Sequence, residues 1–301
     1  MSPGVPSSGQ SNWHGRCWFV LDKLPEPSPL QCERGVYNIS MIELLSADIH
    51  LVTPIFQSID HNVAVVFSVL EGNSPGRVFV DKVQSPTLAL LYPAGAFLYI
   101  IGNVNHPALP QELVHLIFDD ILPAAGEKEM VLFSFSDAWR AKLDLLLQEK
   151  GAIRIARKVF RFNPENNRLL PDWRTRLPPG CSMVEIDAAM AEAYPLYKPL
   201  VDPATRRFGV CLLHDGDIAS ECTAVFVGRG EAEINVLTQD RFQGHGLATL
   251  AASAFIETSL KRGLTPNWAC WPERLASWAL ARKLGFEDLP DLPCHLWAED
   301  L

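Results

Sequence analysis

Three features are missing from this sequence: a long apolar run, a paired-cysteine motif and an excess of positive charge. No apolar stretch approaches the roughly 20 residues of a transmembrane helix. The seven cysteines are scattered, odd in number and without a Cys-x-x-Cys pair, which argues against a disulfide framework or a zinc site. A net charge of -9 argues against nucleic acid and mildly favours cationic small molecules. These absences predict a reduced, cytoplasmic, globular protein with no metal, membrane or nucleic-acid partner.

Two common nucleotide-binding signatures are absent from the segment "DRFQGHGLATLAASAFIETSLKRG", residues 240–263. A nicotinamide-cofactor fingerprint requires a third small residue at the position of Thr249, and a P-loop requires a closing Gly-Lys-Ser/Thr. The segment does contain Gly244 and Gly246, two residues apart, directly before an alanine-rich run.

The alanine-rich run has the apolar spacing of a helix. It begins near Gly246 and ends with Lys261, Arg262 and Gly263, which is typical of a helix C-terminus. The amides of residues 243–248 then lack intrahelical partners and converge on one point, where an anion fits. Glycine at 244 and 246 lets the backbone approach that anion closely. A plain helix cap is the alternative explanation.

The flanking segments predict a mixed sheet in the order β-β-β-α-β-α-β. Three strands are joined by the turns "HDGD" and "GRG", and so pair antiparallel. The predicted elements are strands at Arg207–Leu213, Ile218–Val227 and Glu231–Thr238, the glycine-led helix, a strand at Pro266–Trp271, a helix at Leu275–Leu284 and an apolar run near His295–Trp297. This α/β (α+β) order differs from the repeated βαβ units of a dinucleotide fold.

These residues resemble the GNAT superfamily of N-acetyltransferases. "RFQGHGLAT" fits its Arg/Gln-x-x-Gly-x-Gly/Ala signature, with Arg241, Gly244 and Gly246 in place, and "LASWALARKLGF" resembles its closing helix. The segments "EINVLT", "QGHGLAT" and "PNWAC" are similar to the bacterial branch that includes the zwittermicin A resistance acetyltransferase. The resemblance covers Arg207 to Phe286.

The resemblance implies an acyl-CoA N-acyltransferase fold in the second half and transfer of an acetyl group from acetyl-CoA to a small-molecule amine. The amine attacks directly while both substrates are bound. The pyrophosphate is expected on the Gln243–Thr249 amides and the pantetheine beside Leu237 and Thr238, with His245 shaping or solvating the turn. The implied coenzyme-binding residues are Leu237, Thr238, Arg241, Gln243, Gly244, His245, Gly246, Leu247, Ala248 and Thr249.

Glu233 is the candidate catalytic base. Strand alternation sends Ile234 and Val236 to one face and Glu233, Asn235 and Leu237 to the other, and the matching family strand carries a glutamate. A titratable carboxylate there accepts the proton of the attacking amine. The alternative is a solvated glutamate on a sheet face.

The proton donor to the departing thiolate is not identified by the sequence. The family often places a tyrosine where this chain has Ala281, and no tyrosine follows Tyr197. Ser277, Cys270 or a water remain alternatives, and a thiol, whose pKa is about 8.5, needs little assistance to leave. Arg274 and Ala269 also depart from the family pattern. A coenzyme-binding module that has lost catalysis is therefore the alternative function.

The sequence predicts three regions. Residues 1–40 are rich in proline, glycine and serine, which predicts disorder. Residues 41–163 predict a first lobe with the same element order, but its loop "GNVNHPALPQE" has no Gly-x-Gly. We therefore expect a degenerate GNAT-like lobe without a coenzyme site, followed by a catalytic domain at 164–301 that begins with a linker, Asn163–Gly180. The first lobe would select the acceptor, and a homodimer is left open.

Overall fold

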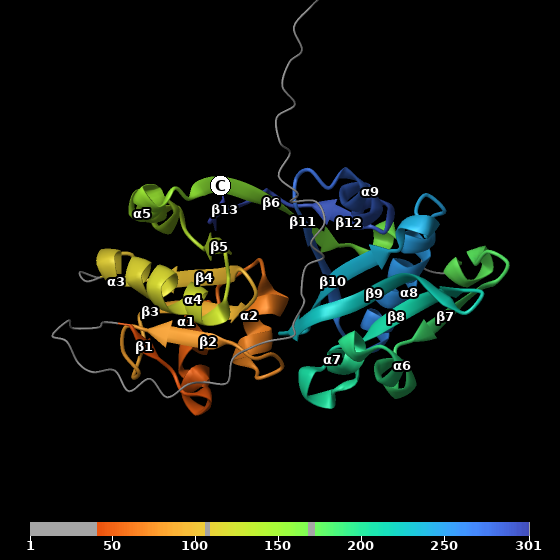
Figure 1. The fold of residues 1–301 in the computed structure, drawn as a ribbon, viewed down its shortest axis with the longest axis horizontal. Helices are drawn as coiled ribbons and strands as arrows, with labels where there is room; N and C mark the ends of the chain where they lie inside the picture. Colours follow the sequence, from red (N-terminus) through yellow and green to blue (C-terminus); the bar gives the residue numbers. More distant parts are fainter. Residues whose placement is uncertain (1–40, 106–108, 168–171, 301) are drawn as a thin grey trace, which may run out of the picture.

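The computed structural model describes residues 41–105, 109–167 and 172–300. The predicted disordered extension, residues 1–40, lies outside the described residues. Two lobes stand side by side, the first built mainly from the first half of the chain and the second from the second half (Figure 1). One mixed sheet runs through both lobes in the order β1-β2-β3-β4-β5-β13-β6-β11-β10-β9-β8-β7, and the predicted mixed α/β class is confirmed.

The first half begins with short helical segments and continues as an alternation of strands and helices. Its elements are β1 (Ile42–Glu43), η1 (Ser46–Val52), α1 (Thr53–Phe56), α2 (Val63–Leu70), β2 (Arg77–Val80), β3 (Leu88–Ala94), β4 (Phe97–Gly102), α3 (Leu109–His115), the π-helical η2 (Leu116–Ile121), α4 (Leu122–Ala125), β5 (Glu129–Ser134), α5 (Asp137–Leu147), η3 (Gln148–Lys150) and β6 (Ile153–Phe162).

The second half contains every element predicted from the sequence and four that were missed: β7, α6, α7 and β12. Its elements are η4 (Pro164–Asn166), η5 (Trp173–Arg176), β7 (Cys181–Glu185), α6 (Ala188–Ala193), η6 (Pro195–Tyr197), α7 (Lys198–Val201), η7 (Pro203–Thr205), β8 (Gly209–His214), β9 (Asp217–Gly228), β10 (Glu231–Thr238), η8 (Asp240–Phe242), α8 (Leu247–Lys261), β11 (Thr265–Cys270), α9 (Leu275–Lys283), β12 (Phe286–Asp288) and β13 (Leu292–Ala298).

The two halves exchange their last strands. β13, at the end of the chain, lies between β5 and β6 in the first lobe and pairs antiparallel with both. β6, which ends the first half, uses residues 158–161 to pair with β11 of the second lobe, and 160–162 to pair with β12. Both strands cross the upper side of the molecule in Figure 1. Each lobe therefore depends on the other half of the chain for a strand in its sheet.

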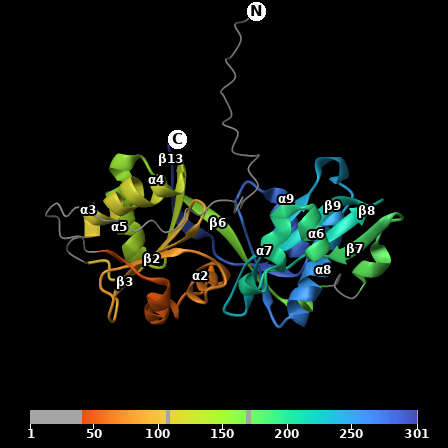
Figure 2. The same ribbon diagram turned by 60° about the horizontal axis from the view of Figure 1, so that its bottom comes forward.

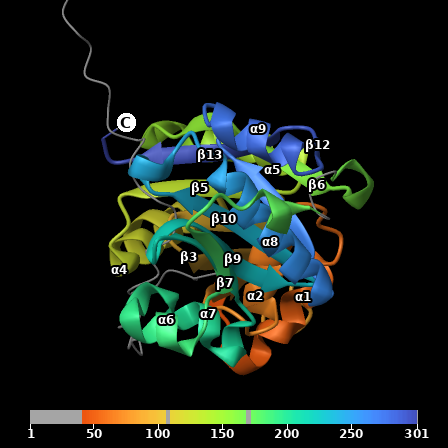
Figure 3. The ribbon, with the colours of Figure 1, turned by 90° about the vertical axis from the view of Figure 1, so that its right-hand side faces the viewer.

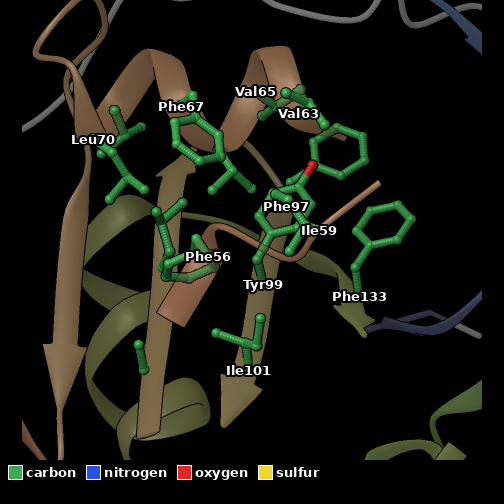
Figure 4. Close-up of a cluster of buried hydrophobic side chains, with 14 of the residues drawn as sticks. Phe56, Ile59, Val63, Val65, Phe67, Leu70, Phe97, Tyr99, Ile101 and Phe133 are labelled. Carbon is green, nitrogen blue, oxygen red and sulfur yellow. The ribbon is translucent and has the colours of Figure 1, made fainter. Parts of the chain in front are cut away.

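The helix α2 fills the junction between the lobes (Figure 2). All eight of its residues are buried. Val63, Val65 and Phe67 belong to an apolar cluster with Phe97 and Tyr99 of β4 (Figure 4). The cluster also includes side chains from β6, β9 and β13, so it spans both lobes; these are Val159, Val225, Phe226, Leu292 and Cys294.

Gly228 lets α2 lie directly on β9. A Cβ atom at this position would lie 2.3 Å from the amide nitrogen of Ser68 and 2.5 Å from the carbonyl carbon of Phe67, both backbone atoms of α2. Side chains reinforce the contact, since the Asn73 amide donates to the Val227 carbonyl at 3.0 Å and the buried Arg207 donates to the Ser74 hydroxyl at 2.9 Å.

The predicted linker is packed against the second lobe. Trp173, in its middle, is 5% exposed and donates its indole hydrogen to Glu257 of α8 at 2.7 Å. Arg174 binds the same carboxylate with distances of 2.7 and 3.0 Å. Together with Lys261, these partners lower the pKa of Glu257 to about 2. The contacts of Trp173 and Arg174 with Glu257 therefore hold this part of the linker against α8.

None of the helices in the three described ranges is long and apolar enough to cross a membrane. Within the same ranges, no three His, Cys, Asp or Glu side chains are grouped so that they could hold a metal ion.

Candidate active site

The parallel strands β10 and β11 separate after a short ladder. They pair only at Glu231 with Thr265, Ala232 with Pro266 and Glu233 with Asn267. Beyond Asn267, β11 follows β6 instead. The edge of β10 from Ile234 to Thr238 is therefore left without a strand partner among the described residues, and its backbone groups are available to a ligand.

The corresponding parallel pair in the first lobe does not separate in this way. β4 and β5 pair at four positions, from Phe97 with Val131 to Ile100 with Ser134 at the end of β5. Beyond the pair, the Trp139 indole donates to the carbonyl of Gly102, the last residue of β4, at 2.8 Å. Trp139 thus occupies a backbone acceptor at the end of β4, and it lines a cavity of about 170 Å³ there together with Gly102 and Phe135.

The open edge of β10 leads into the glycine turn at the start of α8. Gly244 and Gly246 have φ values of 79° and 76°, in the left-handed region that favours glycine. A Cβ atom on either would have no neighbour within 4 Å, so the space in front of the turn is open. Within the described part of the chain, the amides of residues 244–247 donate no backbone hydrogen bond. This donor set suits an anion, as predicted.

The side chains of the turn bind the turn itself. Arg241 forms an ion pair with Asp217 at 2.8 Å. Gln243 donates to Asp240 at 2.8 Å and to the Thr238 carbonyl at 3.3 Å, while a ring nitrogen of the exposed His245 lies 3.3 Å from the Phe242 carbonyl. These contacts fix the shape of the loop and leave the backbone amides as the groups that face outward.

A cavity of about 170 Å³ lies beside the turn and is rich in basic side chains. Arg176 and Lys283 line it together with His245 and Thr249. The Lys283 ammonium donates to the Thr249 hydroxyl at 3.2 Å. Sequence reasoning missed both Arg176 and Lys283, because they come from η5 and α9, far from the glycine motif in the chain.

Glu233 lies at the point where β10 and β11 separate. It is only 5% exposed, and the nearest basic group is the Arg157 guanidinium, at 4.0 Å. Burial raises the pKa of Glu233 to about 7, against a smaller opposing effect of Arg157. The solvated glutamate that was the sequence alternative does not describe this buried side chain.

Arg157 was not predicted from the sequence, because it comes from β6 in the other half of the chain. Its guanidinium lies over Phe97 of the first lobe and Trp271 of the second, 5.3 and 5.5 Å from the ring centroids. The residue therefore holds the two lobes together while facing Glu233.

The remaining β10 side chains alternate as predicted. Ala232, Ile234 and Val236 pack into the apolar core beneath α8, so Glu233, Asn235 and Leu237 project from the opposite face. Leu237 is 39% exposed, and Thr238 shares a 2.8 Å hydrogen bond with Ser220 of β9.

The groups considered as proton donors are differently placed. Ser277, at the start of α9, accepts a 3.0 Å hydrogen bond from the Trp268 indole. Cys270 is buried, and burial raises the pKa of its thiol. Ala281, where the family often carries tyrosine, is fully buried.

Comparison with known proteins also shows similarity to N-acetyltransferases. YdfB of Bacillus subtilis strain 168, described as an uncharacterized N-acetyltransferase, is 27% identical over 235 residues, covering 75% of this chain and 87% of that protein. A GCN5-related N-acetyltransferase-like protein from Streptococcus suis has a similar fold, with a TM-score of 0.62, 24% identity and coverage of 84% of this chain and 99% of that one.

A tandem GNAT protein from the clavulanic acid biosynthesis pathway is similar in fold over both lobes, with a TM-score of 0.59, 15% identity and coverage of 86% and 98%. The sequence profile of the family described as GNAT acetyltransferase matches residues 53–291, most of both lobes. The chain therefore belongs to the GNAT acetyltransferase family and is an N-acetyltransferase of that family.

Proposed function

We propose that this protein transfers the acetyl group of acetyl-CoA to an amine of a small molecule, by direct attack while both substrates are bound. The observation that carries the proposal is the open edge of β10, which starts at buried Glu233 and ends at the outward-facing amides of the glycine turn. Family membership implies an acyl-CoA co-substrate, and the edge leads to free amides that suit its charged end.

The coenzyme would lie along this edge. Its diphosphate fits the amides of residues 244–248, which need no lysine because they supply several donors and close approach. The Gln243 and Thr249 amides, which the sequence also assigned to this site, donate instead to the carbonyls of Asp240 and Gly246 at 3.2 and 3.0 Å. The pantetheine would run beside Leu237 and Thr238 and pair with free backbone groups of β10. Arg176 and Lys283 line the neighbouring cavity and would add positive charge for the phosphorylated end.

Glu233 would act as general base. The amine nitrogen forms a bond to the thioester carbonyl carbon and gives up a proton to the Glu233 carboxylate. The carbon–sulfur bond then breaks and the coenzyme leaves as a thiolate, which takes a proton from water or from a nearby group. A pKa of about 7 is well matched to this role, since a base works best when its pKa lies near the working pH.

The first lobe would serve the acceptor rather than the coenzyme. Residues 41–163 would be a degenerate GNAT-like lobe and 164–301 the catalytic domain, with β6 and β13 exchanged between them. In this assignment β6 supplies Arg157 to the catalytic carboxylate. The likeness of "EINVLT", "QGHGLAT" and "PNWAC" to the branch of the zwittermicin A resistance acetyltransferase supports placing the protein there.

The test is amine-dependent release of coenzyme from acetyl-CoA, measured across polyamines, aminoglycosides, amino acids and peptide N-termini. We expect release with one of these classes and little without an acceptor. Binding of acetyl-CoA by calorimetry without release for any amine would instead support the coenzyme-binding module.

A further inference from the structure

A second carboxylate, the half-buried Glu221, faces the same side of the sheet as Glu233. On β9, Glu221 is opposite Leu237 and Thr223 is opposite Asn235, whereas Cys222 and Ala224 pack beneath α8. The register then shifts, so that Phe226 is opposite Glu233. The face away from α8 thus carries Glu233 at one end and Glu221 at the other; Figure 3 views these strands with α8 and the α6–α7 segment around them.

Glu221 is held in place but has no counter-charge. The Tyr197 hydroxyl, on η6, donates a short hydrogen bond to its carboxylate. Burial raises the pKa of Glu221, and the only group that opposes this effect is Tyr197. In the described residues, no lysine, arginine or histidine forms an ion pair with it. Other buried or bound carboxylates do have one, as Glu233 has Arg157 and Glu257 has Arg174.

A half-buried carboxylate loses part of its hydration, and the Tyr197 hydroxyl replaces only some of it. A cation that binds there would compensate for the rest. The neighbouring surface is apolar, with Leu237 39% and Tyr194 44% exposed, and Tyr194 packs against Tyr197 with ring centroids 5.9 Å apart. A methylene chain that carries a positive charge matches both features.

We propose that Glu221, positioned by Tyr197, binds a second ammonium group of the acceptor, so that the preferred acceptors are linear diamines or polyamines. This inference depends on the proposed function, because Glu233 must receive the attacking amine at the other end. Four residues of extended strand, about 13 Å, separate Glu233 from Leu237, the partner of Glu221. Both glutamate side chains shorten this span. The chain of the acceptor would lie across Asn235 and Thr223.

The experiment compares matched acceptors in wild type and variants. The probes are linear α,ω-diamines and monoamines of equal carbon number, together with spermidine, and kcat and KM are measured by coenzyme release. Wild type should prefer diamines at least about tenfold in kcat/KM. Glu221→Gln should remove this preference by raising KM for the diamine about tenfold, while kcat and the monoamine constants stay within about twofold.

Three further variants separate binding from a structural role. Glu221→Asp should restore part of the preference, because it keeps the charge. Tyr197→Phe should raise KM for diamines less than Glu221→Gln does. It keeps the negative charge of Glu221 and removes only the hydrogen bond that holds the carboxylate in place. Glu192→Gln, on the exposed surface of α6, removes one charge nearby and should change nothing.

Several outcomes overturn the inference. They are turnover of other amines with no preference for diamines, a preference that survives Glu221→Gln, or equal loss of activity toward monoamines and diamines in that variant. In each case amine-dependent release still supports the acetyltransferase. If no amine of any class is acetylated, the proposed function itself fails, and the inference with it.

Discussion

Glu233 is the residue on which the proposed chemistry depends most. Its pKa of about 7 results first from burial, with Arg157 acting in the opposite direction. Because the raised pKa leaves the carboxyl protonated below pH 7, it can accept a proton only above that pH. Turnover of wild type should therefore rise with pH through about 7.

Replacing Glu233 by Gln should lower kcat by about 10² or more, since it removes general-base assistance. The affinity for acetyl-CoA should stay nearly unchanged, because the amide lies off the coenzyme turn. The step near pH 7 should also disappear from the pH profile. Steady-state kinetics and calorimetry check both points, and wild-type turnover in this variant would remove Glu233 from the mechanism.

Arg157 should tune that same pH dependence from the other half of the chain. Its charge lowers the pKa of Glu233, so Arg157→Met should move the rising limb of the pH profile to higher pH. Arg154→Met is the matched control, because Arg154 lies on the same strand but pairs with Asp144. If turnover of a folded Arg157→Met protein rises at the same pH as that of wild type, Arg157 contributes only to packing.

At the scale of elements, the site depends on how β10 and α8 are joined. A strand edge left open after Glu233 meets a turn in which two glycines hold a left-handed backbone. Neither feature alone defines a coenzyme site, since many helices begin at a glycine. Because the open edge of β10 continues into the glycine turn, the two together offer one binding surface from Glu233 to the proposed anion site.

Introducing a carboxylate into the turn tests this element. Gly244→Glu or Gly246→Glu should abolish binding of acetyl-CoA in calorimetry, because a negative side chain would stand where the diphosphate belongs. Gly230→Glu is the matched control: Gly230 also has a left-handed backbone, with φ of 76°, and open space around it, but lies in the β9–β10 hairpin. Equal loss of binding in the control would point to backbone strain rather than to the site.

At the scale of the whole molecule, the exchange of β6 and β13 joins the lobes into one unit. A fragment that begins near Asn163 would lose β6, and with it a partner of β11, β12 and β13. The predicted domain boundary therefore does not mark a point at which the chain can be cut without loss of sheet pairing.

The strand exchange predicts cooperative unfolding. Calorimetry should give a single transition whose calorimetric and van't Hoff enthalpies agree, because neither sheet is complete without the other half of the chain. Gly228→Ala should lower the temperature of this single transition by forcing α2 away from β9. Two resolved transitions in the wild-type protein would show that the lobes unfold independently.

The sequence by itself determined the local elements and the coenzyme motif. Strand alternation placed Glu233, Asn235 and Leu237 on one face, and the glycine spacing located the start of α8, because both patterns depend on neighbours within a few residues. The segment 181–201, with β7, α6 and α7, was missed because its elements are short and α7 has a proline in its first turn.

Tertiary structure alone decided the environment of the site. Three contacts illustrate this: the approach of Arg157 from β6 to Glu233, the hydrogen bond of Tyr197 to Glu221, and the insertion of β13 beside β5. Each joins residues that are 24 or more positions apart in the chain. No periodicity in the chain records such pairings, because pairing between distant strands is set by packing of the whole core rather than by local conformation.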